Sequence, residues 1–162
     1  MPTHLLALAN ELGLALKTKQ LLLATAESCT GGLIAELITA IPGSSTWFER
    51  GFVTYTNLAK QEMLGVQKTT LEQYGAVSEQ TVIEMALGAI KHSHAQLSIA
   101  VTGIAGPDGG SELKPVGTVC FAWVKANKIC LAKTHQFSGD RIAIRQQAAE
   151  FAMTELIKLI SH

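Results

Sequence analysis

The sequence predicts an α/β fold: one three-layer α/β/α domain over residues 1–162, built on a mixed, largely parallel sheet. Residues 21–26 and 97–102 are apolar runs of strand length, typical of strands that are buried on both faces of a sheet. Segments with apolar residues at helical spacing alternate with these runs, as in layered α/β domains. The sequence contains no internal repeat and no linker-like tract, so we expect one domain.

The first third of the chain is expected to alternate helices with strands. A helix over residues 3–17, with Thr3 at its N-cap, leads into the strand at 21–26. A second helix over residues 33–40 precedes a short aromatic and β-branched strand at 52–56.

The middle of the chain predicts two more helices before the second apolar strand. One helix starts at Asn57 and ends at Gly65, a residue type that commonly terminates helices. The next runs to about His92, with Ser78 as its N-cap and Glu79 in its first turn.

The last third predicts a hairpin and a long helix. Strands at 117–124 and 128–137 are joined by a turn at Ala126 and Asn127, which makes the sheet mixed. Residues 138–140 then cap a final helix that ends near Ile160.

Charge and hydrophobicity exclude several classes of partner. The chain has 13 basic and 13 acidic residues, and the basic ones form no run, so we expect neither nucleic acid nor a membrane surface as a partner. No apolar run is long enough to cross a bilayer. Because 48% of the residues are hydrophobic and only 16% are charged, we predict a homodimer that covers a further apolar face.

The cysteines and histidines indicate a cytoplasmic protein without a metal or other cofactor. Three cysteines, none in a Cys-x-x-Cys pair, suggest neither a disulfide framework nor a zinc site. Cys120 and Cys130 lie in strand-like stretches, where we expect them to be small buried hydrophobes. The five histidines show no metal-ligand spacing, and we expect them to be structural or exposed.

Two loops follow the apolar strands, where ligands bind in open α/β sheets. In the first, Ser28 precedes a helix whose N-terminus can stabilise a negative charge, and Gly31 and Gly32 allow a ligand to approach the backbone. From this stretch alone, a helix cap by Ser28 or Thr30 is the favoured alternative. The second loop, residues 102–110, consists mostly of small residues that either wrap a phosphate or ribose or form a tight turn.

Four further residues are candidates for chemistry or binding. Tyr55 and Lys60 could reach the same sheet edge, but Lys60 can act as a base only if burial makes it neutral, and a solvated lysine is the favoured alternative. Arg141, with Arg145 four residues later on the same helix face, suits a phosphate, although surface ion pairs are more common.

Five short motifs occur in order at residues 26–32, 55–66, 74–78, 102–107 and 114–119. Taken together, they resemble the CinA C-terminal domain family, which includes stand-alone nicotinamide-nucleotide amidases. The resemblance extends over almost the whole chain.

This resemblance implies hydrolysis of nicotinamide mononucleotide to nicotinate mononucleotide and ammonia, in pyridine-nucleotide salvage, by a metal-free Ser–Lys mechanism. Ser28 would be the nucleophile, Lys60 the general base and Tyr55 a residue that moves the proton or holds Lys60. The implied substrate-binding residues are Thr30, Gly31, Gly32, Thr102, Gly103, Ala105 and Gly106, with Arg141 or Arg145 for the phosphate.

Two rival hypotheses remain open from the sequence. Cys29 could be the nucleophile, because a helix N-terminus activates a thiolate. The same glycine-rich loops would also suit a nucleotide-binding regulatory module without catalysis.

Many members of the family carry a large N-terminal domain, and none precedes the first predicted helix here, so we expect none of its activity.

Overall fold

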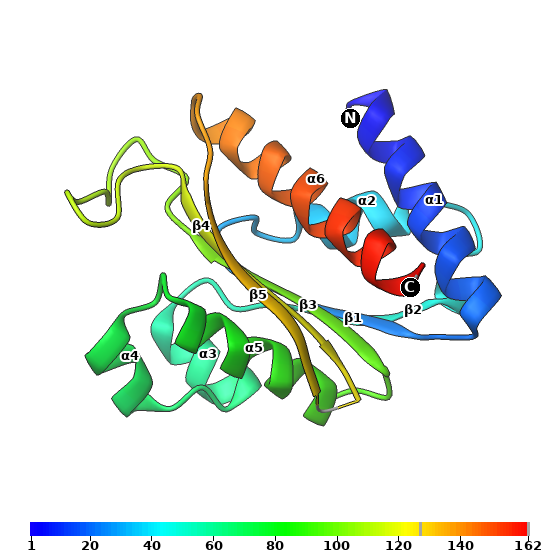
Figure 1. The fold of residues 1–162 in the computed structure, drawn as a ribbon, viewed down its shortest axis with the longest axis horizontal. Helices are drawn as coiled ribbons and strands as arrows, with labels where there is room; N and C mark the ends of the chain where they lie inside the picture. The colour runs from blue at the N-terminus through cyan, green and yellow to red at the C-terminus, as the bar shows by residue number, and fades with distance from the viewer. Residues whose placement is uncertain (127, 162) are drawn as a thin grey trace.

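A five-stranded sheet separates two layers of helices in the computed structural model, which describes residues 1–126 and 128–161 (Figure 1). The strand order is β2-β1-β3-β4-β5. The strands are β1 (Leu23–Glu27), β2 (Phe48–Val53), β3 (Leu97–Gly103), β4 (Thr118–Lys125) and β5 (Lys128–Gln136). β1 pairs in parallel with β2 and β3, whereas β4 is antiparallel to β3 and β5. In the described part of the chain, β4 alone therefore opposes the other strands, and the predicted mixed, largely parallel sheet is confirmed.

Each face of the sheet has its own helices and its own hydrophobic core. Helices α1 (Thr3–Lys19), α2 (Leu33–Thr39) and α6 (Arg141–Ile160) cover one face; α3 (Asn57–Leu64), α4 (Lys68–Tyr74) and α5 (Glu79–Lys91) cover the other (Figure 1). Side chains alternate along each strand, so that Ile99 and Val101 of β3 join the first core and Ala100 joins the second. Because both faces are covered, β1 and almost all of β3 are buried.

Local capping signals position several helices as predicted. The Ser78 hydroxyl accepts a hydrogen bond from the Thr81 amide at the start of α5, and Asp140 accepts one from the Ala143 amide at the start of α6. Gly65 ends α3 in the left-handed conformation. Thr3, by contrast, does not cap α1: extended Pro2 occupies the N-cap, and its carbonyl accepts the first amide hydrogen bonds.

The second strand was predicted too late in the sequence. β2 starts at Phe48 and ends at Val53, rather than covering residues 52–56. As an edge strand, β2 tolerates Glu49 and Arg50, which form an ion pair with each other and break the apolar pattern.

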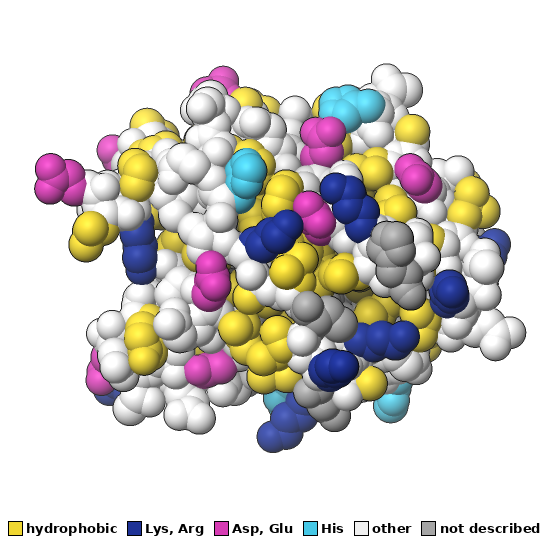
Figure 2. All heavy atoms as spheres, in the orientation of Figure 1, with side chains coloured by type: hydrophobic (Ala, Val, Ile, Leu, Met, Phe, Trp, Pro, Cys, Tyr) yellow, Lys and Arg dark blue, Asp and Glu magenta, His cyan; other side chains and the backbone are white. Residues whose placement is uncertain are grey.

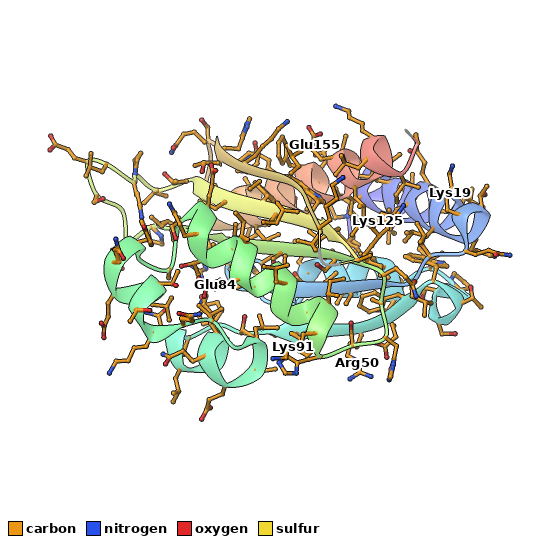
Figure 3. All side chains as sticks on the ribbon, turned by 60° about the horizontal axis from the view of Figure 1, so that its bottom comes forward. Lys19, Arg50, Glu84, Lys91, Lys125 and Glu155 are labelled. Carbon is orange, nitrogen blue, oxygen red and sulfur yellow. The ribbon has the colours of Figure 1, made fainter. Side chains whose placement is uncertain are left out.

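Helix α4 was missing from the predicted order of elements, because the groups that start it are far apart in sequence. Glu84 on α5 accepts hydrogen bonds from the Gln67 amide (2.8 Å) and the Thr70 hydroxyl (2.6 Å). Figure 3 shows Glu84 projecting from α5. This carboxylate pairs one free amide at the start of α4 and holds a side chain of its first turn, where no local side chain caps the helix.

Three further expectations concern the hairpin, the cysteines and membrane spans. β4 and β5 form the predicted antiparallel pair, but Asn127 of the predicted turn lies outside the described residues. Cys120 is buried as expected, whereas the side chain of Cys130 is not among those that the structure describes. Among the described helices, none is both long and apolar enough to cross a bilayer.

We expect Gly88→Ala to destabilise the fold, because α5 touches the end of α3 at this glycine. A Cβ atom there would overlap the Leu64 carbonyl oxygen, so α3 would have to move. We expect a loss of about 1–3 kcal/mol in the free energy of unfolding, measured by urea denaturation. At an exposed helical position this change would instead stabilise by up to about 1 kcal/mol, so a higher denaturation midpoint would contradict the close contact.

Candidate active site

A pocket of about 270 Å³ lies where β1 and β3 end, at the carboxyl edge of the parallel strands. Its wall is assembled from five separate segments of the chain. They contribute Ser28 and Cys29; Tyr55, Asn57 and Lys60; Ala76 and Val77; residues 102–106 with Asp108 and Gly109; and Arg141.

Ser28 and Lys60 meet at the base of this pocket. Ser28 directly follows β1, and Lys60 lies in the first turns of α3. The Lys60 Nζ atom lies 2.9 Å from Ser28 Oγ and donates a second hydrogen bond to the Thr54 carbonyl at 3.1 Å. Lys60 is 1% exposed and Ser28 7%, so the pair is almost wholly shielded from water.

The backbone at the ends of three strands fixes this contact. The Ser28 amide donates to the Val101 carbonyl, and the Thr54 amide donates to the Glu27 carbonyl. Adjacent parallel strands therefore hold Ser28 and Thr54 side by side, and Thr54 in turn accepts from Lys60.

Burial favours the neutral form of Lys60. It lowers the pKa of the Lys60 amine, because a charged ammonium loses its hydration in this environment. Among the described residues, no carboxylate forms an ion pair with Lys60. A neutral amine beside a serine hydroxyl can accept the hydroxyl proton, which is the requirement for a serine nucleophile.

The residue that caps α2 is Glu27, which the sequence analysis did not select. Its carboxylate accepts hydrogen bonds from the Thr30 hydroxyl (2.6 Å) and from the Ile34 and Ala35 amides (3.0 Å each). Neither Ser28 nor Thr30 caps the helix, and the first-turn amides expected to face a ligand are occupied by Glu27. Glu27 is the last residue of β1 and α2 begins only at Leu33, so no local cap pattern in the sequence indicated this role.

Tyr55 and Arg141 form the outer part of the pocket. Arg141 donates to the Tyr55 hydroxyl and to the Gly106 carbonyl, both at 2.7 Å. It thereby ties the segment after β2 to the loop after β3. Tyr55 is 56% exposed, and its hydroxyl contacts Arg141 rather than Lys60.

The loop after β3 lines one side of the pocket through Thr102, Gly103, Ala105 and Gly106. The Thr102 hydroxyl donates to the Ala76 carbonyl at 2.9 Å, so it anchors the segment before α5. Gly106 has φ +78°, and a Cβ there would lie 2.5 Å from Val116, which explains the need for glycine. Asp108 of the same loop also lines the pocket, although the sequence analysis did not single it out.

Four of the sequence candidates lie outside the pocket wall: Thr30, Gly31, Gly32 and Arg145. Thr30 is fully buried, with its hydroxyl on Glu27. Arg145 donates to the Cys29 and Thr30 carbonyls behind the Ser28 loop.

Cys29 is poorly suited to act as a nucleophile. Burial, together with the nearby Glu27 carboxylate, raises the pKa of its thiol to about 12. The reactive thiolate is therefore negligible at neutral pH. Lys60 Nζ also makes its side-chain hydrogen bond with Ser28, not with Cys29.

A model of the CinA C-terminal domain family matches residues 5–160. The nicotinamide-nucleotide amidohydrolase PncC of Escherichia coli (strain K12) is 53% identical over 154 residues, covering 95% of this chain and 93% of that protein. The PncC protein of Enterobacter agglomerans is 57% identical over 151 residues, covering 93% and 92% respectively.

Solved structures show the same fold. The competence/damage-inducible protein CihA from Agrobacterium tumefaciens superposes with a TM-score of 0.92 at 44% identity, covering 100% of this chain and 98% of that one. A CinA superfamily protein from Klebsiella pneumoniae 700603 gives a TM-score of 0.94 at 37% identity, covering 98% of both chains.

We expect the Cys29 thiol to resist alkylation in the folded protein. Its burial and raised pKa both oppose thiolate formation, so iodoacetamide at pH 8 should modify Cys29 far more slowly than in urea. Peptide mass spectrometry would follow the modification at this residue. Equal rates in the folded and unfolded protein would contradict a buried, protonated thiol.

Proposed function

This chain belongs to the CinA C-terminal domain family, and we propose that it hydrolyses nicotinamide mononucleotide with Ser28 as nucleophile and Lys60 as general base. The activity is that of a nicotinamide-nucleotide amidohydrolase, the name carried by relatives that are 49–57% identical over nearly the whole chain. The observation that supports the mechanism is the 2.9 Å contact between Ser28 Oγ and the buried Lys60 Nζ. The products are nicotinate mononucleotide and ammonia, as in pyridine-nucleotide salvage.

The acylation half of the reaction follows from this contact. Neutral Lys60 takes the Ser28 proton while Oγ bonds to the carboxamide carbon, and the C=O electron pair moves onto oxygen. As the carbonyl re-forms, the C–N bond breaks and Lys60 transfers its extra proton to the leaving nitrogen. Ammonia departs and the nicotinoyl group remains esterified to Ser28.

Water completes the cycle through the same lysine. Lys60 removes a proton from water, whose oxygen attacks the ester carbon. The bond to Ser28 Oγ then breaks, and Lys60 returns the proton to that oxygen. Each half-reaction leaves Lys60 neutral, and the second also restores the Ser28 hydroxyl for another substrate.

Arg141 is the group that we assign to the substrate phosphate. Among the described pocket residues it is the one arginine, and Lys60 at the base is neutral when it acts as a base. Tyr55 holds this guanidinium in place instead of relaying the Ser28 proton. Thr102, Gly103, Ala105 and Gly106 would contact the nucleotide between the phosphate and the carboxamide.

We also propose one amidase domain over residues 1–162 that works as a cytoplasmic homodimer. Cys29 and Cys120 are free thiols, which suits a reducing compartment. Hydrophobic side chains reach the surface between charged residues of both signs over β5 (Figure 2), and Ile129 of β5 is 45% exposed. A partner subunit would cover such side chains.

Replacement of Ser28 by alanine should abolish turnover. We expect ammonia release from nicotinamide mononucleotide by the wild type, and a loss of about 10³-fold or more in kcat for Ser28→Ala. Cys29→Ser should keep most of the activity, because the thiol is not the nucleophile. Loss of activity in Cys29→Ser with activity retained in Ser28→Ala would assign the reaction to Cys29. A folded wild type that releases no ammonia would favour the hypothesis of a nucleotide-binding module without catalysis.

The rate should also depend on the protonation of Lys60. Protonated Lys60 cannot accept the Ser28 proton, so kcat should fall as pH falls through the lysine pKa, which burial sets below the ordinary value of 10.5. Steady-state kinetics across the range in which the protein stays folded would show this limb. Lys60→Met should remove most of kcat together with that limb, and an unchanged profile in this variant would exclude Lys60 as the base.

A further inference from the structure

Arg145 holds the backbone of the nucleophile loop from outside the pocket. Its Nε donates to the Cys29 carbonyl at 3.2 Å, and its Nη2 donates to the Thr30 carbonyl at 2.8 Å. Both acceptors lie within two residues of Ser28. Arg145 is half-buried and, among the described residues, takes part in no ion pair, so these carbonyls are its side-chain partners.

The two carbonyls belong to one tight turn that starts at Ser28. The Gly31 amide donates to the Ser28 carbonyl at 3.0 Å, which places Cys29 and Thr30 in the two central positions. A peptide group is planar and trans, so fixing each carbonyl also fixes the amide of the next residue on the opposite side. Arg145 therefore restrains the two peptide planes that follow Cys29 and Thr30.

Gly31 makes room for this contact. Its φ is +60°, and a Cβ there would lie 3.1 Å from Arg145 Nη2, closer than ordinary van der Waals contact. The glycine thus permits the left-handed backbone and the close approach of the guanidinium. The Thr30 hydroxyl also donates a hydrogen bond of 2.6 Å to the Glu27 carboxylate.

We propose that Arg145 is a positioning residue for the amidase reaction, which holds the Ser28 turn so that Oγ stays within reach of Lys60 Nζ. This inference rests on the proposed role of Ser28. It separates two arginines that lie one turn apart on α6: Arg141 faces the substrate, whereas Arg145 acts through the backbone of the nucleophile loop. A misplacement of about 1 Å at a reacting atom can cost about 100-fold in rate.

The first experiment compares Arg145→Ala with Arg141→Ala on nicotinamide mononucleotide. We expect Arg145→Ala to lower kcat by about 10- to 100-fold with little change in KM, and Arg141→Ala chiefly to raise KM. Guanidinium ion at millimolar concentration should restore part of the kcat of Arg145→Ala. A raised KM with wild-type kcat, or wild-type kinetics altogether, in folded Arg145→Ala would overturn the proposal.

Two glycine variants test the same contact without changing any charge. Gly31→Ala should lower kcat, because its Cβ would press on the Arg145 guanidinium. Gly32→Ala is the matched control: Gly32 has φ +102°, but its Cβ would lie at an ordinary 3.5 Å from Val53 and away from Arg145. Gly32→Ala should therefore keep more kcat than Gly31→Ala, and the reverse order would count against Arg145.

A covalent probe separates this inference from the proposed function. The rate at which a fluorophosphonate labels Ser28, followed by mass spectrometry, reports the nucleophile without the nucleotide. Arg145→Ala should be labelled more slowly than the wild type, and Arg145→Lys, which offers one compact donor group, should lie between them. Equal labelling rates would refute the role of Arg145, even if the wild type did not hydrolyse the nucleotide. A wild type that neither labels nor releases ammonia would refute the proposed function itself.

Discussion

The burial of Lys60 against Ser28 is the constraint on which the rest of the site depends. An amine on a flexible four-carbon stem reaches a fixed hydroxyl only if both are held by rigid neighbours. Here the parallel strands supply that rigidity: the Ser28 amide is held by Val101, and the Thr54 carbonyl beside it accepts from Lys60. The carboxyl ends of these strands therefore set the 2.9 Å separation on which the proposed proton transfer depends.

Helices from both faces of the sheet support this edge. On one face, α5 packs against the end of α3 at Gly88 and so fixes the helix that carries Lys60. On the other face, α6 reaches the pocket wall with Arg141 and the nucleophile turn with Arg145. The three-layer arrangement thus has a functional consequence, because helices on opposite faces of the sheet support the residues that we propose as nucleophile and base.

Features that depend on neighbouring residues could be predicted from the sequence, and features that depend on distant ones could not. The caps at Ser78 and Asp140 and the two buried strands follow from local pattern, and a pocket lies at the strand ends where the sequence predicted ligand binding. Helix α4 escaped prediction because its cap, Glu84, comes from another helix. The different roles of Arg141 and Arg145 were equally hidden, since spacing along a helix does not say which loop each guanidinium meets.

A neutral buried lysine also links the activity to the stability of the fold. In the unfolded chain Lys60 has its ordinary pKa of 10.5, whereas burial lowers the pKa in the folded state. Between these two values the unfolded state binds more protons, so the free energy of unfolding rises with pH across this window. Stability and the fraction of neutral Lys60, the form that the proposed mechanism requires, therefore both increase with pH. The two hydrophobic cores stabilise the fold enough to offset the free-energy cost of burying this amine. A more hydrated lysine would destabilise the fold less, but it would be protonated and so unable to accept the Ser28 proton in the proposed mechanism.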